Sequence, residues 1–96
     1  MKEREYLLTL YEIYKNVLSI KEREYFEDYY FEDLSLQEIA DNNNVSKSYV
    51  SKYINNIESK IINFEQVLNI NEKNNKIRKV ISKLDKKTKE EIEQIL

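Results

Sequence analysis

Apolar side chains recur three or four residues apart along most of the chain, which is the spacing of amphipathic helices. The first such run predicts a helix from about Lys2 to Leu18. Ser19 followed by Glu22 has the pattern of a capping box, which predicts a second helix from about Ile20 to Phe31. The apolar positions of the first helix are Leu7, Leu10, Tyr11, Tyr14, Val17 and Leu18. The second helix carries the aromatic residues Tyr25, Phe26, Tyr29 and Tyr30.

The middle of the chain has the spacing of a helix-turn-helix. A second capping box, Ser35 with Glu38, predicts a short helix from about Leu36 to Asn43. Asn44 stands where a left-handed turn residue is expected, and asparagine tolerates that conformation well. Ser46 can cap the next helix, and the small Ala40 lets the two helices cross closely. We expect a small core between them, made of Ile39, Val45, Val50 and Tyr53. In many proteins the second helix of this motif lies in a nucleic-acid groove.

The helix after Ser46 is longer than recognition of a groove requires. Its apolar residues step by four, three, four, three and four over about 20 residues, which is a heptad-like seam. This seam must be buried, either against the first helix of the same chain or against a second copy. The second possibility predicts a homodimer through the long helix. The seam consists of Val50, Ile54, Ile57, Ile61, Phe64 and Leu68.

The last part of the chain predicts two shorter helices. Residues Asn69 to Asn75 are polar and predict a break. Ile77, Val80, Ile81 and Leu84 then predict a fifth helix, and Thr88 with Glu91 predicts the start of a last one after a link at 85–87. Together these elements predict an all-α fold of five to six helices in a single domain over residues 1–96. Its helix-turn-helix core would cover about residues 20–68, and its C-terminal segment, 70–96, is basic.

Composition excludes several kinds of chemistry. The chain has no glycine, proline, cysteine, histidine or tryptophan. It therefore lacks the two residues that most often form the tight turns between strands, and it has no thiol or imidazole for catalysis or metal binding. Without a glycine-rich phosphate loop either, we predict a non-enzymatic protein with no catalytic residues, no cofactor and no metal site. No apolar run resembles a signal peptide or a membrane span, which predicts a cytoplasmic protein that does not contact membranes.

Two groups of residues are candidates for nucleic-acid contacts. The first is the polar face of the long helix, where lysine can contact guanine or phosphate and asparagine can pair with adenine. It comprises Lys47, Ser48, Ser51, Lys52, Asn55 and Asn56. The second group offers phosphate contacts, which suit RNA as well as DNA because they carry no sequence information. It comprises Lys73, Lys76, Arg78, Lys79 and Lys83.

The charge distribution sets a competing hypothesis beside nucleic-acid binding. The net charge is −2, with −4 in residues 1–34, −1 in 35–69 and +3 in 70–96. Carboxylates such as Glu27 and Asp28 lie between the aromatic residues of the second helix and would repel phosphates, so these rings are expected to pack rather than stack on bases. The alternative is therefore a protein–protein adaptor that uses the helix-turn-helix as a scaffold and the acidic second helix as its contact. A continuous positive face joining Lys47, Lys52 and the lysines of 73–89 would favour nucleic acid, and an interrupted one would favour the adaptor.

The motif residues also resemble known families. Residues 20–68 resemble region 4 of bacterial sigma factors, whose pattern is carried here by Ser35, Leu36, Glu38, Ile39, Ala40, Val45, Ser46 and Val50. The chain more closely resembles the small YlxM-like family, over about residues 6–70. The matching segments are LYEIYKNVLS, YFEDYYFEDLSLQEIADNNNVSKSYV and NNIESKIINFEQVL.

The resemblance implies a sigma-region-4-like domain with an added N-terminal helix and a long fourth helix. It further implies dimers and a regulatory role accessory to the signal recognition particle, with a component of that particle as a partner. The chain departs from the family pattern at three positions: Asn43 replaces an apolar residue, Asn44 the usual glycine, and Lys47 a common arginine. Lysine lacks the bidentate geometry of arginine.

Overall fold

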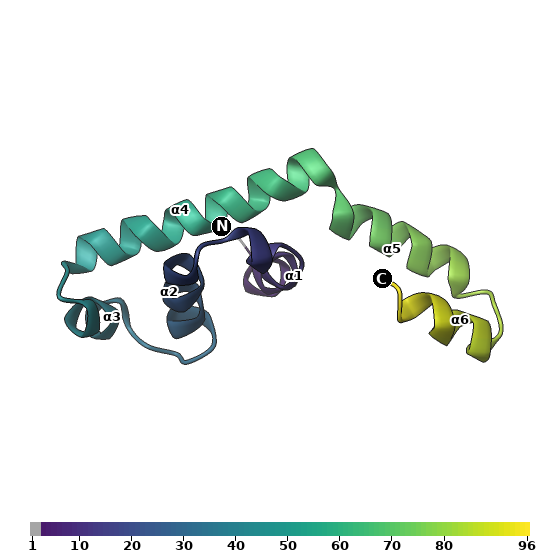
Figure 1. Cartoon of the computed structure of the whole chain (residues 1–96), viewed down its shortest axis with the longest axis horizontal. Helices are drawn as coiled ribbons and strands as arrows, with labels where there is room; N and C mark the ends of the chain where they lie inside the picture. Colours follow the sequence, from purple (N-terminus) through teal and green to yellow (C-terminus); the bar gives the residue numbers. More distant parts are fainter. Residues whose placement is uncertain (1–2) are drawn as a thin grey trace.

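The computed structural model describes residues 3–96 and contains six α-helices and no strand within that range (Figure 1). The all-α prediction is therefore confirmed. The helices are α1 (Arg4–Tyr14), α2 (Ile20–Tyr30), α3 (Leu36–Asn43), α4 (Lys47–Leu68), α5 (Ile70–Ile81) and α6 (Lys86–Glu93), with a 3-10 turn at Lys15–Val17 after α1. The start expected at Lys2 lies outside the described residues.

The predicted caps determine where the middle helices begin. Ser19 and Ser35 each accept a hydrogen bond from the backbone N–H three residues on, and the glutamates there reach back, so both capping boxes are confirmed. Ser46 accepts from the N–H of Tyr49 and begins α4. Asn44 has a φ of 55° and ends α3 in the left-handed conformation expected for the turn. These local contacts fix the helix-turn-helix at the residues that the sequence indicates.

Two expectations at the C-terminal end were wrong. The break predicted over Asn69 to Asn75 is confined to Asn69, whose φ is 54°, and α5 begins at once with Ile70. A single left-handed residue is enough to separate α4 from α5, because the Glu65 carboxylate accepts hydrogen bonds from the backbone N–H groups of Asn71 and Glu72 in the first turn of α5. The last helix is capped by Asp85, which accepts from the N–H of Thr88, so Thr88 lies inside α6 rather than at its cap.

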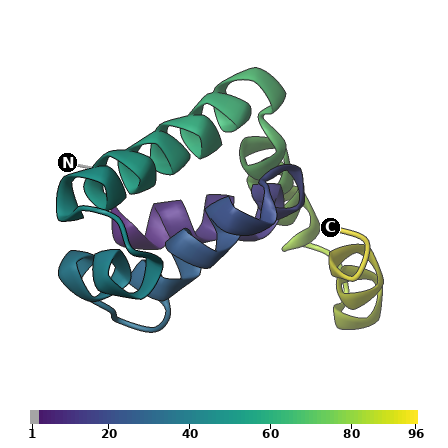
Figure 2. The same cartoon turned by 60° about the vertical axis from the view of Figure 1, so that its left-hand side comes forward.

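Helix α4 lies across α1, α2 and α3, and the core fills the space between them (Figures 1 and 2). Most of the seam of α4 faces this core, so it is intramolecular from Val50 to Ile61, while Leu68 is exposed. The helix-turn-helix core forms as predicted, with Ala40 fully buried at the crossing of α3 and α4. Asn43 does not open this core, because it is exposed and donates its side-chain N–H to the carbonyl of Ile39. The buried seam residues are Val50, Ile54, Ile57 and Ile61.

After Asn69 the chain turns away from the core, and α5 and α6 form an arm (Figure 1). The arm gives the molecule an extent of 53 × 25 × 24 Å. It contacts the rest of the molecule where α5 meets α1, and only Ile81 of its apolar residues is buried. Across residues 3–96, no helix combines the length and the apolar character needed to cross a membrane.

Candidate nucleic-acid interface

The candidate contact residues of the long helix all belong to the N-terminal half of α4. Ser51 is half-buried and the other five are exposed. Ser48, Lys52, Asn55 and Asn56 lie on the side of α4 opposite the apolar seam, because Val50, Ile54 and Ile57 face the core. Ser51 lies beside the seam, and Lys47 lies close to its edge in the exposed first turn of the helix. The structure thus brings Lys47, Ser48, Ser51, Lys52, Asn55 and Asn56 onto one accessible surface, which we call the α4 face.

No carboxylate interrupts the α4 face from within its own helix. The two acidic residues of α4, Glu58 and Glu65, are 8% and 7% exposed and lie on the buried side. The hydroxyl of Tyr30 donates to Glu58, and the hydroxyl of Tyr14 donates to Glu65 at 2.6 Å. Burial and these hydrogen bonds raise the pKa of both tyrosines, that of Tyr14 to about 12. The cations of α4 therefore reach the surface while its anions do not.

An aromatic cluster beside the α4 face did not emerge from the sequence. Tyr49 and Tyr53 of α4 stack with ring centroids 5.7 Å apart, and Tyr53 packs on Tyr25 of α2 at 4.7 Å. Lys21 places its ammonium 5.2–5.7 Å from all three ring centroids and donates to the hydroxyl of Tyr49 at 3.2 Å. The i, i+4 spacing of the two α4 tyrosines is visible in the sequence, but their meeting with Lys21 depends on how α2 packs against α4.

Further along α4, Lys60 is engaged by a carboxylate of α2. Its ammonium lies 3.2 Å from both carboxylate oxygens of Glu22. Burial acts to raise the pKa of Glu22, but the hydrogen bonds from the Ser19 N–H and from Lys60 outweigh it and lower that pKa. The charge of Lys60 is therefore largely balanced within the protein.

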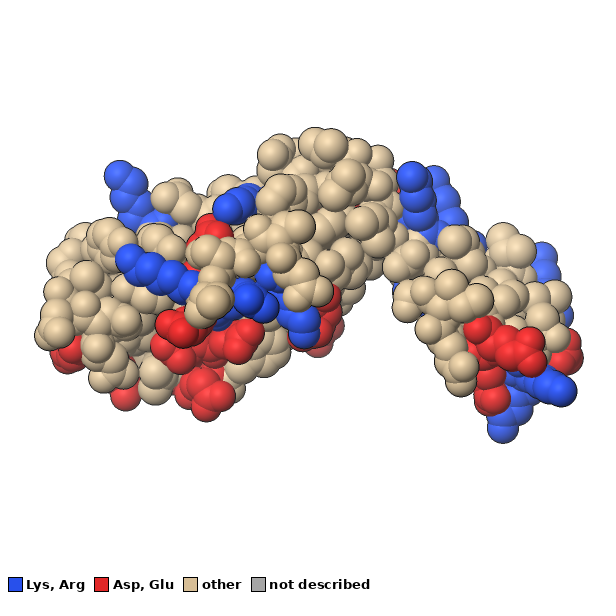
Figure 3. Space-filling model, viewed as in Figure 1, with Lys and Arg blue, Asp and Glu red and all other residues tan. Residues whose placement is uncertain are grey.

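The basic residues of the arm do not join the α4 face. At about 1.5 Å of rise per residue, the axis of α4 spans about 24 Å between Lys52 and its end at Leu68. The one cation of α4 within this stretch, Lys60, is paired with Glu22. Figure 3 shows uncharged surface between the Lys and Arg residues of the core and those of the arm. The continuous positive face that would have favoured nucleic acid is thus interrupted.

The arm's own cations are also spread around α5 rather than gathered on one side. Lys76 pairs with Glu72 at 3.0 Å, and Arg78 lines a groove of about 510 Å³ between α5 and α1. At 100° per residue, Lys73 lies next to the apolar stripe of α5 and Lys79 lies opposite it, whereas Lys83 follows the end of the helix. The five candidate phosphate contacts are all exposed, but they form no single patch.

The acidic side of α2 lies away from the α4 face (Figure 3). Burial and the neighbouring Glu24, Glu32 and Glu27 raise the pKa of Asp28. Glu27 also has a role in packing, because it accepts a hydrogen bond from the hydroxyl of Tyr11. Like charges thus accumulate on α2, which distinguishes this surface from the α4 face.

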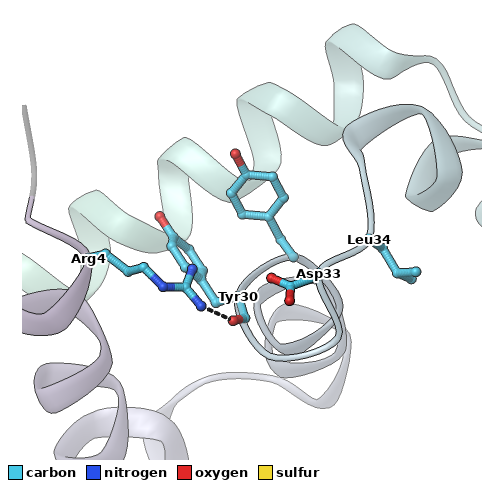
Figure 4. A pocket seen from close by; sticks show the side chains of 5 residues that line it. Arg4, Tyr30, Asp33 and Leu34 are labelled. Carbon is cyan, nitrogen blue, oxygen red and sulfur yellow. Dashed lines mark hydrogen bonds between the residues drawn. The ribbon is translucent and has the colours of Figure 1, made fainter.

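A hollow of about 330 Å³ at the C-terminal end of α2 is lined on one side by Arg4 (Figure 4). The Arg4 guanidinium donates to the backbone carbonyl of Tyr30 at 2.5 Å and lies 5.3 Å from the Tyr30 ring centroid. A cation at a helix C-terminus satisfies a free carbonyl and interacts favourably with the helix dipole. We therefore interpret Arg4 as a structural residue that connects α1 to the C-terminal end of α2. Among residues 3–96, no group of three or more His, Cys, Asp or Glu side chains could hold a metal ion.

Comparison with known proteins agrees with this architecture. The model of the family UPF0122, described as "Putative helix-turn-helix protein, YlxM / p13 like", matches residues 1–96. A UPF0122 protein of Ureaplasma urealyticum serovar 10 is 46% identical over 74 residues, which cover 77% of this chain and 75% of the relative. One from Fusobacterium nucleatum is 38% identical over 91 residues, covering 94% and 88%. No solved structure matches the chain. The chain belongs to the UPF0122 family of YlxM / p13-like helix-turn-helix proteins.

Proposed function

We propose that the protein is a non-enzymatic regulator that binds nucleic acid, DNA in the first instance, through the α4 face. The observation that carries this proposal is the inward orientation of Glu58 and Glu65. Both carboxylates have structural roles inside the protein, since Glu58 accepts a hydrogen bond from Tyr30 and Glu65 from Tyr14. Their inward orientation also leaves the exposed face of α4 with lysines and without carboxylates. A helix that approaches phosphates gains directly from this arrangement, because no acidic side chain of its own then opposes binding.

The proposed division of roles follows from side-chain chemistry. Lys47 and Lys52 contact phosphates as point charges, and Asn55 and Asn56 can pair with base edges. Ser48 and Ser51 can donate to or accept from either. With so few cations, binding by one copy is modest and depends on salt with a log–log slope of about −2.

The test is a pair of double variants with equal change in charge. Lys47→Ala with Lys52→Ala should abolish binding to a labelled duplex in fluorescence anisotropy and leave the thermal midpoint unchanged, because both side chains are exposed. Lys86→Ala with Lys87→Ala, at exposed positions on α6, is the control and should retain most of the binding. Equal losses in the two double variants would show that only net charge matters and would contradict a role for the α4 face.

An adaptor that binds a basic protein partner is the second candidate, and the interrupted positive surface favours it. The contact would be the acidic side of α2. Glu27 is a poor test position because it is bonded to Tyr11. Glu24→Lys with Glu32→Lys reverses two exposed charges instead. Loss of partner capture by this variant, with capture unaffected by the Lys47 and Lys52 substitutions, would support the adaptor and contradict the first proposal.

Three finer expectations remain predictions. A role accessory to the signal recognition particle is implied by the family resemblance, and binding to purified particle RNA or protein would test it. A homodimer through the long helix would have to use the part of α4 that the core leaves exposed, namely Val67 and Leu68. Localisation in the cytoplasm likewise follows from the sequence expectation alone.

A further inference from the structure

We infer that the groove beside Tyr49 and Tyr53 holds an unstacked base of a single-stranded nucleic-acid segment. This rests on the proposed function and adds to it a preference of the α4 face for nucleic acid that has an unpaired base beside the phosphates it contacts. The groove has a volume of about 250 Å³ and is lined by Tyr49, Lys52, Tyr53 and Asn56. It therefore combines two aromatic rings, one cation and one amide on adjacent turns of α4.

The two rings form a platform whose orientation is fixed. They are inclined by only 23° to each other, and the ring of Tyr53 also packs against the ring of Tyr25. Tyr49 remains 40% exposed, although its hydroxyl is bonded to Lys21. Bases stack on aromatic side chains irrespective of sequence, because every base has a π-face, and a ring held in place loses little entropy when a base binds.

The surrounding groups suit a base attached to a phosphate backbone. Lys52 can contact a phosphate, and Asn56 can pair with the edge of the base. Lys21 adds a second cation beside the rings. Glu22, which follows Lys21 directly in the sequence, carries a negative charge that is paired with Lys60. The ligand is thus expected to be an anionic polymer rather than a neutral peptide.

A cationic ligand is a poor fit for the same rings. Aromatic side chains also recognise ammonium groups through cation–π contacts. Here the protein's own Lys21 already supplies such a cation to Tyr25, Tyr49 and Tyr53. The groove is therefore left with stacking and hydrogen bonding as its means of recognition.

The experiment compares two labelled strands of equal length and phosphate number, oligothymidylate and an abasic strand. The intact protein should bind oligothymidylate about tenfold more tightly in fluorescence anisotropy, which is the gain expected from stacking one base. Tyr49→Leu should abolish this difference, whereas Tyr49→Phe should preserve it because the ring remains. Tyr6→Leu is the matched control, since Tyr6 is 41% exposed on α1, and it should preserve the difference as well.

The outcomes separate this inference from the proposed function. Equal binding of both strands by the intact protein, with both weakened by Lys47→Ala and Lys52→Ala, would overturn the base site and leave the α4 face in place. Binding of neither strand nor a duplex would overturn both proposals. Binding of a proline-rich peptide that depends on Tyr49, with no preference between the strands, would show that the groove takes peptide and would overturn the inference.

A second measurement does not depend on a folded variant. In NMR spectra of the intact protein, addition of oligothymidylate should shift the ring protons of Tyr49 upfield, because a stacked base places them in its ring current. The ring protons of Tyr6 should not move. Shifts of equal size at both tyrosines, or at neither, would contradict a base stacked in this groove.

Discussion

The hydroxyl of Tyr14 donates a 2.6 Å hydrogen bond to the Glu65 carboxylate and so joins the end of α1 to the last turn of α4. The same carboxylate accepts the backbone N–H groups of Asn71 and Glu72 at 3.1 Å each. Glu65 therefore acts as the cap of α5 from within α4, which compensates for an Asn69 cap that makes no side-chain hydrogen bond. One buried carboxylate thus holds three helices and fixes where the arm leaves the core.

Tyr14→Phe should lower the free energy of unfolding by about 1–3 kcal/mol, because it removes one donor from a buried carboxylate and keeps the ring. Urea unfolding followed by circular dichroism measures the change. Tyr6→Phe removes an exposed hydroxyl and should change stability by less than about 0.5 kcal/mol. If the two variants were equally stable, the Tyr14 hydrogen bond would not contribute to the fold.

Stability should fall in the alkaline range. Burial and its hydrogen bond to Glu65 raise the pKa of Tyr14 to about 12, and burial also raises the pKa values of Tyr11 and Tyr30. A raised pKa in the folded state means that the unfolded chain loses its protons first. The stabilising contribution is complete below pH 10.0, the unfolded value, and is lost as the pH rises through the folded pKa.

Thermal midpoints measured from pH 8 to pH 11 would test this expectation, with the decline beginning at about pH 10. Tyr14→Phe removes one of the three groups and should make the decline shallower. A midpoint that stays constant up to pH 11 would show that the tyrosines titrate normally in the folded protein.

The sequence predicted the elements that depend on neighbouring residues and missed those that depend on distant ones. The capping boxes at Ser19 and Ser35 and the left-handed Asn44 were predictable because each involves contacts within four residues. The role of Glu65 was not, because its partner Tyr14 is 51 residues away. In the sequence, Glu65 counted only as one more negative charge.

The same limit applies to the candidate site. Helical spacing was enough to place Lys47 and Lys52 on an exposed face. It could not show that the acidic residues of α4 turn inward, since that requires knowing which side of α4 meets α1 and α2. Nor could it show that Lys21 meets Tyr49 and Tyr53, which lie 28 and 32 positions further along the chain.

The seam of α4 should tolerate a charge only where the core does not cover it. Ile61 is fully buried, so Ile61→Asp should destabilise the fold by about 4 kcal/mol or more and unfold the chain. Val67 is 71% exposed, so Val67→Asp should leave the helical circular dichroism signal unchanged. Light scattering on Val67→Asp also tests the homodimer, because a charge at this position would disfavour an interface there. A folded monomer from Ile61→Asp would contradict the intramolecular seam.

Asp28→Asn should stabilise the protein at neutral pH. Burial and the carboxylates of Glu24, Glu32 and Glu27 raise the pKa of Asp28, which means that its ionised form is less favourable in the folded chain than in the unfolded one. The sign follows directly: the carboxyl costs nothing below pH 3.8, its ordinary value, and its cost grows as the pH rises through the folded pKa. Because the side chain is only half-buried, the gain from asparagine should be a few tenths to about 1 kcal/mol.

The gain from Asp28→Asn should be visible in urea unfolding at pH 7, shrink at pH 3 and decrease in high salt, since screening weakens repulsion between exposed charges. Asp41→Asn on α3 is the control: Asp41 is exposed and accepts a hydrogen bond from Gln37, so its substitution should not stabilise. A loss of stability in Asp28→Asn at pH 7 would mean that the carboxylate makes a favourable contact in the folded protein. The acidic side of α2 would then not hold repulsion that a basic partner could relieve.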